Sequence, residues 1–499
     1  MLKTILLGSG SNVLVLLVKM GLTFIMAPIL LHNLGNYDYG LWEMLGAVIG
    51  YMGMLDLGIR PAITRFSARY DAENNREAQR QLLATGFVFM AAIGVLLALS
   101  FAIWGIYFPH SLAQEGSDTA RYTLLCLILS AQFLLYMPGY VAEGMLEGLQ
   151  KYHIKNLITL INSLLGSAII FNTITPENGL VLLAGINALG LTSKYIIYFI
   201  ILSGRSCGGL SLKLSYFSRD KLLELLRFGS KSLIQGVSHR IESATDTLVI
   251  GWFMGPAMVP LYSIPANLVG YLRSIGWNIA HVFMPVFSNL SAAGKQQEIV
   301  KVYLLSSKYM VAIMTLIATG VVGLGDKFIS IWMGSEYGDD ALILIMVLVG
   351  YVILPLLNPF ASRYLTAIDQ HGVYAKYGPV SALVNLILSI ILVGPYGIIG
   401  VALGSLIPIG FFVLVYLRCS CKHLGIGVSV YIKKSVLPSV LPIVAMASVL
   451  FVFRHNIQID SYFLLLLGGG VAAILYVFLF WLFALDRQEK EYILKKIKR

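Results

Sequence analysis

Long apolar stretches follow one another along almost the whole chain, separated by short polar loops. Each holds roughly 18–30 residues, and a helix needs about 20 apolar residues to cross the hydrocarbon core of a bilayer. The pattern predicts about fourteen membrane-spanning helices, at 7–31, 39–61, 82–108, 121–146, 156–175, 179–203, 229–254, 257–287, 303–332, 341–367, 376–393, 396–421, 432–453 and 460–485. We therefore expect an all-α polytopic membrane protein with no soluble domain between its spans.

The composition agrees with this prediction, at 58% hydrophobic residues and a mean hydropathy of +0.80. Short loops leave little room for an active site that is supplied from water. The sequence also shows no pattern of metal ligands and no catalytic nucleophile with its partners. We expect no enzymatic activity and no cofactor.

Lysine and arginine are distributed very unevenly between the two sets of loops. If the N-terminus is cytoplasmic, the loops on that side hold about 26 of them and the opposite loops hold one, Arg454. Basic loops mark the cytoplasmic side of a membrane protein. We expect a multi-pass protein of the plasma (bacterial inner) membrane with both termini in the cytoplasm. The net charge of +11 reflects this topology and does not indicate nucleic-acid binding.

The chain carries an internal repeat at a nearly constant offset of about 220 residues. The spacing from Pro61 to Ser67-Ala68 recurs from Pro285 to Ser291-Ala292, and Pro138 with Lys155 recurs as Pro359 with Lys376. Copies of six spans enter from the same side, and parallel repeats of this kind carry substrate between two lobes. The predicted divisions are an N-terminal lobe at 1–203, a cytoplasmic linker at 204–228 with a short surface helix, a C-terminal lobe at 229–421, and two further helices with a basic tail at 422–499.

The seventh predicted span has the most polar stripe. Its members recur at three- and four-residue steps, with Arg240 at the rim: Ser232, Gln235, His239, Glu242 and Asp246. A charge at mid-bilayer costs about 3 kcal/mol on insertion scales, so several on one helix indicate a wet interior.

Other spans carry weaker stripes. They comprise Asn267, Tyr271, Ser274, Asn278 and His281 in span 8; Gln132, Tyr136, Tyr140, Glu143 and Glu147 in span 4; Tyr377, Ser381, Asn385 and Ser389 in span 11; and Asn12, Lys19 and Thr23 in span 1. Hydrogen bonding between helices explains most Ser, Thr and Asn positions. Ionisable groups such as Lys19 and Asp246 favour a cavity. We also expect Asp56 and Arg60 to pair, whereas Lys194, Arg273 and Arg363 receive no assignment.

Three segments resemble a known family: Asp56-Leu-Gly58, Gly144-Met-Leu-Glu-Gly-Leu-Gln-Lys-Tyr152, and Asp246-Thr-Leu-Val-Ile-Gly251 followed by Tyr262. They are similar to the polysaccharide transporter (Wzx-type) branch of the multidrug/oligosaccharidyl-lipid/polysaccharide exporter superfamily, over the whole chain. The resemblance implies alternating access of two six-helix lobes that flip an undecaprenyl-pyrophosphate-linked oligosaccharide outward. Its expected partners are that lipid-linked oligosaccharide, membrane lipids, and the polysaccharide polymerase and chain-length machinery, with no nucleic acid.

The polar residues give this function a physical basis. Lys19 and Arg240 occupy corresponding places in the two repeats and are the candidate pair for the pyrophosphate. Aromatic and amide side chains suit the sugars, and we expect this role for Tyr136, Tyr140, Tyr271 and Asn278. Coupling protons are expected at His239, Glu242 and Asp246, although a structural salt bridge with Arg240 explains the carboxylates equally well.

Three other functions remain open at this stage, one of which is a lipid II flippase, for which the sequence shows no specific motif. A cation-coupled drug exporter of the same superfamily would use Glu242 and Asp246 as an acidic lumen, but span 1 offers Lys19 and no carboxylate. A membrane polymerase or ligase of glycan chains would need a sizeable external loop, and the predicted outer loops are about a dozen residues or fewer.

Overall fold

The computed structural model describes residues 2–111, 119–370 and 372–497, without the side chains of 2–10, 12–13, 55, 206, 230–243, 374–375, 493 and 496–497. Throughout this part of the chain the regular structure is helical, as the apolar pattern predicts. In lipid a helix satisfies its own backbone hydrogen bonds, so it is a favoured way to cross a bilayer. The predicted all-α membrane fold is confirmed.

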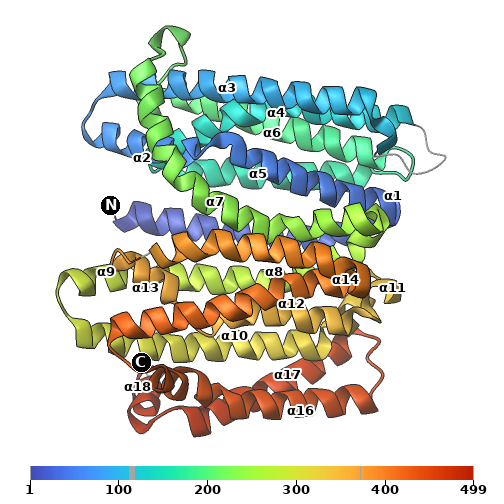
Figure 1. Cartoon of the computed structure of the whole chain (residues 1–499), viewed down its shortest axis with the longest axis vertical. Coiled ribbons are helices and arrows are strands. Elements are labelled where there is room, and N and C mark those ends of the chain that lie inside the picture. Colours follow the sequence, from blue (N-terminus) through green and yellow to red (C-terminus); the bar gives the residue numbers. More distant parts are fainter. Residues whose placement is uncertain (1, 112–118, 371, 498–499) are drawn as a thin grey trace. The chain divides into compact units, whose positions relative to one another are not determined.

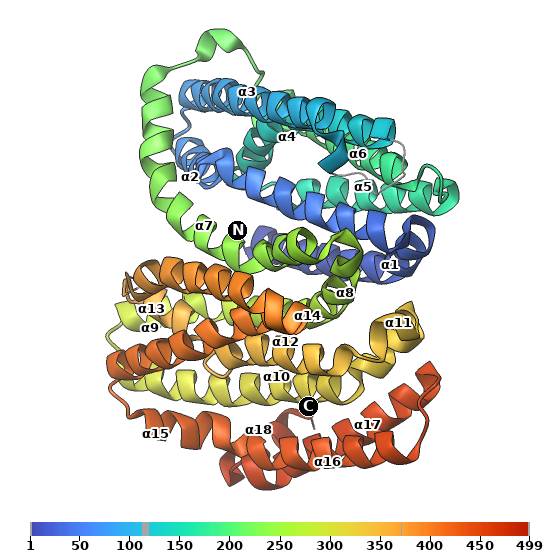
Figure 2. The same cartoon turned by 45° about the vertical axis from the view of Figure 1, so that its right-hand side comes forward.

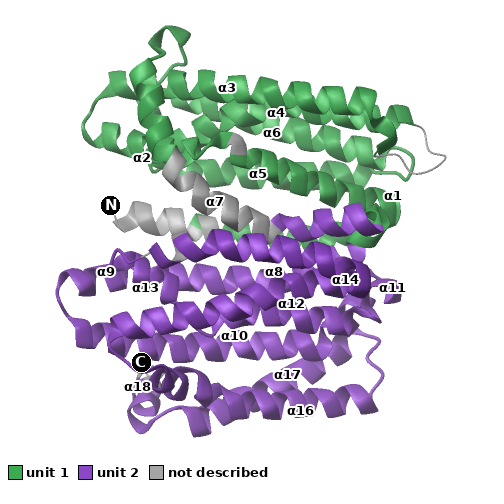
Figure 3. Ribbon diagram, viewed as in Figure 1, with its two compact units in different colours: residues 1–240, 255–259 green, residues 241–254, 260–499 purple. Residues whose placement is uncertain are grey.

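The chain forms two compact units, shown in Figure 3. Unit 1 comprises residues 1–240 and 255–259, and unit 2 comprises 241–254 and 260–499. Helix α7 therefore contributes to both. The two predicted six-helix lobes, at 1–203 and 229–421, are defined by the sequence repeat and not by these units, and their boundaries stay a prediction.

Unit 1 is built from helices shown in Figures 1 and 2. They are α1 (Leu2–Met52), α2 (Ile59–Ala72), α3 (Arg76–Tyr107), α4 (Thr119–Gly148), α5 (Tyr152–Thr173), α6 (Gly179–Ser203) and the first part of α7 (Arg219–Met254). Helix α4 packs against α2, α3 and α6, and α1 packs against α5. This arrangement surrounds α4 with neighbours, so polar groups on α4 must find partners on other helices.

Unit 2 contains the last part of α7 and the helices that follow it. They are α8 (Val259–Val282), α9 (Met284–Ala292), α10 (Gln296–Met333), α11 (Ser335–Gly338), α12 (Ala341–Leu356), α13 (Ala361–Ala367), α14 (Gly372–Leu424), α15 (Val428–Tyr431), α16 (Val440–Asn456), α17 (Tyr462–Leu479) and α18 (Arg487–Ile497). Helix α10 contacts α12, α16 and α17. A bidentate ion pair fastens α16 to α10, with Arg454 Nη1 and Nη2 at 2.8 and 2.6 Å from the Asp326 carboxylate.

Ten helical segments of the described residues are long and apolar enough to cross a membrane. Two of them each cover two predicted spans, since α1 and α14 continue through kinks at Gly35 (φ 71°) and Gly397 (φ 55°). Helices α7 and α8 occupy the predicted seventh and eighth spans. The linker differs from the prediction, because α7 begins at Arg219 and runs on without a break into the seventh span.

Left-handed backbone positions recur along the chain at regular spacing. They are Gly35 and Gly255, Asn74 and Gly294, and Gln150 and Asp369. Each pair is separated by about 220 residues, the offset of the sequence repeat. Such conformations are costly for most residues and mark tight turns. Equivalent turns therefore accompany the repeated sequence motifs.

Candidate functional site

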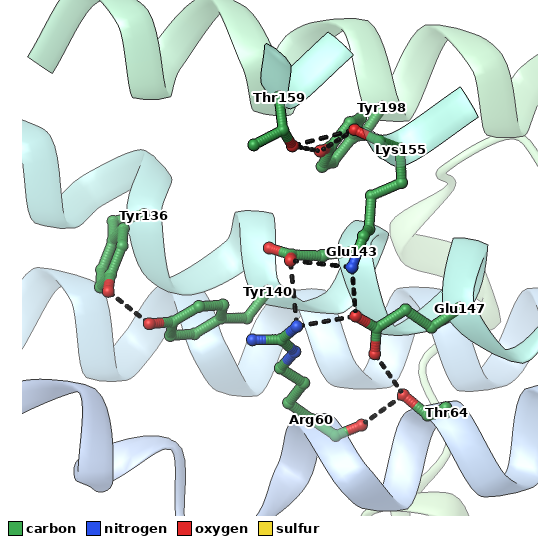
Figure 4. Close-up of polar contacts among 9 residues, drawn as sticks. All are labelled: Arg60, Thr64, Tyr136, Tyr140, Glu143, Glu147, Lys155, Thr159 and Tyr198. Atoms are coloured by element: carbon green, nitrogen blue, oxygen red, sulfur yellow. Dashed lines mark hydrogen bonds and ion pairs between the residues drawn. The ribbon is translucent and has the colours of Figure 1, made fainter. Parts of the chain in front are cut away.

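The main polar site of unit 1 is built on one side of α4. Tyr136, Tyr140, Glu143 and Glu147 follow at helical spacing, and Figure 4 shows them along the same side of the helix. The Tyr140 hydroxyl donates to that of Tyr136. The two carboxylates are only 13% and 15% exposed. The predicted stripe of span 4 is therefore real, and its acidic end lies largely inside the unit.

Arg60 reaches both carboxylates from the first turn of α2. Its Nη2 lies 3.0 Å from Glu143 Oε1 and 2.8 Å from Glu147 Oε1. The backbone just before it leaves the helix, with Gly58 at φ 73°, and Asp56 Oδ1 accepts the Gly58 N–H at 2.8 Å. Asp56 and Arg60 do interact as expected, since Asp56 accepts the Arg60 backbone N–H and its charge attracts the guanidinium, but the guanidinium makes its close ion pairs with Glu143 and Glu147.

Lys155 in α5 approaches the same carboxylates from another side. Its Nζ lies 2.8 Å from Glu147 Oε1 and 3.9 Å from Glu143 Oε1. The adjacent Thr159 hydroxyl lies 3.0 Å from the Tyr198 hydroxyl. Two cations and two anions thus form one network across α2, α4 and α5 (Figure 4). Breaking a buried pair of this kind leaves an uncompensated charge and typically costs about 3–5 kcal/mol.

A further lysine brings positive charge in excess to this network. Lys194 in α6 has its Nζ 4.3 Å from the centre of the Tyr195 ring and 6.0 Å from that of Tyr198. Its charge interacts with those of Glu143, Lys19, Arg60 and Lys155. Because the Asp56 carboxylate also interacts with Arg60, the group combines four cationic side chains with three carboxylates, and Lys19 is the exposed member of the four.

A second buried polar group lies in unit 2 around Asp246. The Tyr262 hydroxyl donates to Asp246 Oδ2 at 2.5 Å, and the Ser405 hydroxyl donates to the same oxygen at 2.8 Å. Asn385 Nδ2 donates to Ser405 Oγ at 2.6 Å. Asp246 Oδ1 and Asn385 Oδ1 are buried and make no hydrogen bond with the described residues. A carboxylate oxygen that lacks a donor, such as Asp246 Oδ1, can take a proton or a small cation.

The predicted stripe of α8 lies at the surface of unit 2. Asn278 is exposed and Tyr271 half-buried, whereas Leu272 and Ala280 of the same helix are buried. Asn278 Nδ2 donates to the Ser274 carbonyl of its own helix at 2.7 Å. The bond we find for Asn278 is therefore made within α8 and not to a neighbouring helix.

Three predicted residues of α7 cannot be placed. The side chains of His239, Arg240 and Glu242 lie outside the described residues. The pairing of Lys19 with Arg240 and the coupling roles of His239 and Glu242 therefore stay predictions.

Arg60, Lys155 and Lys194 were not identified as site residues from the sequence. Each comes from a helix other than α4, and helical periodicity records only neighbours within one helix. A usable signal was nonetheless present: carboxylates at 143 and 147 inside an apolar span require cationic partners. The sequence offers two such cations: Arg60, which lies four residues after Asp56, and Lys155, which lies just beyond the end of α4.

Comparison with known proteins identifies the family. A family model described as "Polysaccharide biosynthesis protein" matches residues 5–291. The probable low-salt glycan biosynthesis flippase Agl15 of Haloferax volcanii is 22% identical over 454 residues, which cover 90% of this chain and 89% of that protein.

Two solved structures share the fold. The lipid II flippase MurJ in an inward closed conformation gives a TM-score of 0.70 at 17% identity, covering 94% of this chain and 98% of that one. An inward-facing multidrug resistance MATE family transporter of the MOP superfamily gives 0.66 at 16% identity, covering 83% and 96%. These likenesses show the fold alone. Together with the family match they place the chain among multi-pass membrane transporters and not among enzymes, and it belongs to the polysaccharide biosynthesis protein family.

Proposed function

We propose that this protein flips a polyprenyl-pyrophosphate-linked oligosaccharide across the plasma membrane by alternating access. The oligosaccharide would be a repeat unit of O-antigen, capsule or exopolysaccharide. The family match, the glycan flippase Agl15 and the flippase fold support this class of substrate. The observation that carries the proposal is the excess of positive charge in unit 1, where the four cations Lys19, Arg60, Lys155 and Lys194 accompany three carboxylates.

A pyrophosphate needs several cationic donors when it leaves water. Lysine offers a compact charge with three donors, which suits phosphate oxygens from any direction. Glu143 and Glu147 hold Arg60 and Lys155 in place before substrate arrives. Tyr136 and Tyr140 extend the same side of α4, and aromatic side chains of this kind are suited to contacts with sugar rings. The arrangement therefore suits a head group that joins a charged pyrophosphate to polar sugar rings.

Lys19 and Lys194 provide the test of this proposal. Lys194→Gln and Lys19→Ala should each weaken binding of undecaprenyl-pyrophosphate-linked oligosaccharide by about 10- to 100-fold, the value of one or two charged hydrogen bonds. Lys19→Arg should retain part of the affinity because the cation is preserved. Binding and flipping would be measured with the purified protein in nanodiscs and proteoliposomes.

The matched control is Arg69→Gln, since the Arg69 side chain is 60% exposed and pairs with Glu73 on the surface of α2. It should leave both activities unchanged. Normal flipping by both lysine variants would contradict the pyrophosphate assignment.

A drug exporter is the alternative function, given the likeness of fold to a multidrug transporter. A cationic drug would be repelled by the surplus lysines of unit 1. The carboxylate of Asp246 is buried, and one of its oxygens already accepts from Tyr262 and Ser405. These two observations favour an anionic substrate, with Asp246 used for an ion that couples transport.

A further inference from the structure

Outside these sites, a guanidinium, an indole and an imidazole meet at the surface of unit 2. Arg363 in α13 has its Nη2 2.9 Å from Nε2 of His281 in α8. The guanidinium carbon lies 4.7 Å from the centre of the Trp277 ring, and the Trp277 and His281 rings are 6.1 Å apart. Each of the three side chains therefore touches the other two.

The contact between Arg363 and His281 fixes the charge of the cluster. A guanidinium has donors only, so Nε2 of His281 must accept the hydrogen bond. The imidazole is then neutral and carries its proton on Nδ1. The cluster combines the planar cationic fork of an arginine, a neutral N–H donor and an aromatic face.

Two members of the cluster are exposed and the third, Arg363, is half-buried. Trp277 is 45% exposed and His281 is exposed, while Gly276 and Ala280 on the neighbouring side of α8 are buried. The sugar-facing candidates Tyr271 and Asn278 belong to the same helix, so the cluster continues the polar stripe of α8 toward its last turn.

We propose that Arg363, His281 and Trp277 form a subsite for a carboxylated pyranose, such as a uronic acid, in the lipid-linked oligosaccharide. This inference rests on the proposed function and adds that the transported glycan is acidic. The guanidinium fork matches a carboxylate in two parallel hydrogen bonds, and arginine stacks on aromatic rings as it binds. The face of the indole turned away from the guanidinium then packs against the apolar face of the sugar ring.

The type of cation distinguishes this subsite from the proposed pyrophosphate site. The surplus cations of unit 1 are lysines, which bind phosphate as point charges. The cation here is an arginine whose guanidinium lies over an indole ring, and its planar fork suits a carboxylate attached to a sugar ring. An anionic lipid head group offers related chemistry but no ring with an apolar face, and the experiment distinguishes the two sources.

The test compares two probes that differ only in one carboxylate. They are undecaprenyl-pyrophosphate-linked disaccharides ending in glucuronic acid or in glucose, bound to the full-length protein in phosphatidylcholine nanodiscs. The wild type should bind the glucuronate probe about tenfold more tightly, the value of one charged hydrogen bond. Arg363→Gln should remove this preference while leaving affinity for the glucose probe unchanged. Trp277→Leu should weaken binding of both probes.

Controls separate the possible failures. Arg363→Lys, which keeps the charge and loses the fork, should retain only part of the preference; Arg69→Gln should retain all of it. Lys194→Gln should weaken both probes equally. If the wild type binds neither probe, the proposed function itself fails. If it binds both equally, if Arg363→Gln weakens both alike, or if phosphatidylglycerol in the nanodisc abolishes the preference, the acidic-sugar subsite is wrong.

Discussion

At the scale of the residue, Asp246 shows how a buried carboxylate can serve a transport cycle. Tyr262 and Ser405 both donate to Oδ2, which stabilises the charged form from one side. Oδ1 has no donor among the described residues, and the same holds for Asn385 Oδ1. A carboxylate satisfied on one oxygen only is costly to keep buried and charged. A proton or a small cation would complete it, which is consistent with the coupling role that we propose for Asp246.

We expect Asp246→Asn to stop transport and to preserve substrate binding. The amide oxygen can still accept from Tyr262 and Ser405, and the amide nitrogen takes the place of the protonated oxygen, so the fold is retained. The site is then held as if permanently protonated and the cycle stalls. Affinity for the undecaprenyl-pyrophosphate-linked probe and its flipping in proteoliposomes would be measured separately.

Asp460→Asn makes the same chemical change at an exposed position between α16 and α17 and should leave both measurements unaltered. Weakened binding by Asp246→Asn would instead make this carboxylate a substrate contact, as a drug exporter requires. Unchanged flipping would leave it a structural residue.

At the scale of the element, α7 is held against the first turn of α2 by two glycines. A Cβ atom at Gly229 would lie within 3.0 Å of the Leu57 carbonyl oxygen, and one at Gly58 would meet the Gly229 backbone in the same way. Ser218, which caps α7, also receives a hydrogen bond from Thr85 of α3 at its carbonyl. The start of α7 is thus fixed within unit 1, while its last residues belong to unit 2.

Gly229→Ala should therefore destabilise the protein by about 1–3 kcal/mol, the usual cost of overpacking. The obstacle is backbone, which cannot rotate away as a side chain would. Thermal unfolding in detergent, followed by the fluorescence of a thiol-reactive or tryptophan reporter, measures the loss. Gly185→Ala in α6 is the matched control because no atom lies within 4 Å of its added Cβ. Equal unfolding temperatures for the two variants would show that α7 can move away from the start of α2 to make room for the added methyl group at no cost in stability.

The elements were largely predictable from hydropathy, and their ends were not. The expected span at 341–367 coincides with α12 and α13, but α3 and α7 begin six and ten residues before the expected spans, at Arg76 and Arg219. Hydropathy reports the turns that lie in lipid, whereas these first turns are charged and are capped by Asn75 and Ser218.

The candidate site was also predictable only in part. Periodicity within α4 predicted Tyr136, Tyr140, Glu143 and Glu147 as one stripe, because residues three and four apart share a helix face. The partners Arg60 and Lys155 come from α2 and α5, and pairing across helices depends on packing that one sequence does not encode locally. Asp246 was predicted as a candidate, and its bond to Ser405 of α14 emerged only with the fold.

At the scale of the whole molecule, the distribution of charge predicts the orientation of the protein in the membrane. The loops predicted to be cytoplasmic hold nearly all the loop lysines and arginines, and translocating such loops is unfavourable. An outward flippase needs this orientation, since a lipid-linked repeat unit assembled in the cytoplasm must be received there. Orientation is therefore part of the proposed function and can be tested without any substrate.

Reporter fusions after Arg76, Arg219 and Arg487 should be cytoplasmic, and fusions at His110 and Gly334 should be on the outer side. Helix α3 runs for 32 residues from Arg76 to Tyr107, and α10 runs for 38 residues to Met333. At 1.5 Å per residue both exceed the hydrocarbon core of about 30 Å, so the ends of each helix lie on opposite sides. Alkaline phosphatase activity at the outer sites and fluorescence of green fluorescent protein at the inner sites provide the readout. A cytoplasmic result at His110 or Gly334 would reverse or break the topology, and the parallel arrangement of the two repeats would fail with it.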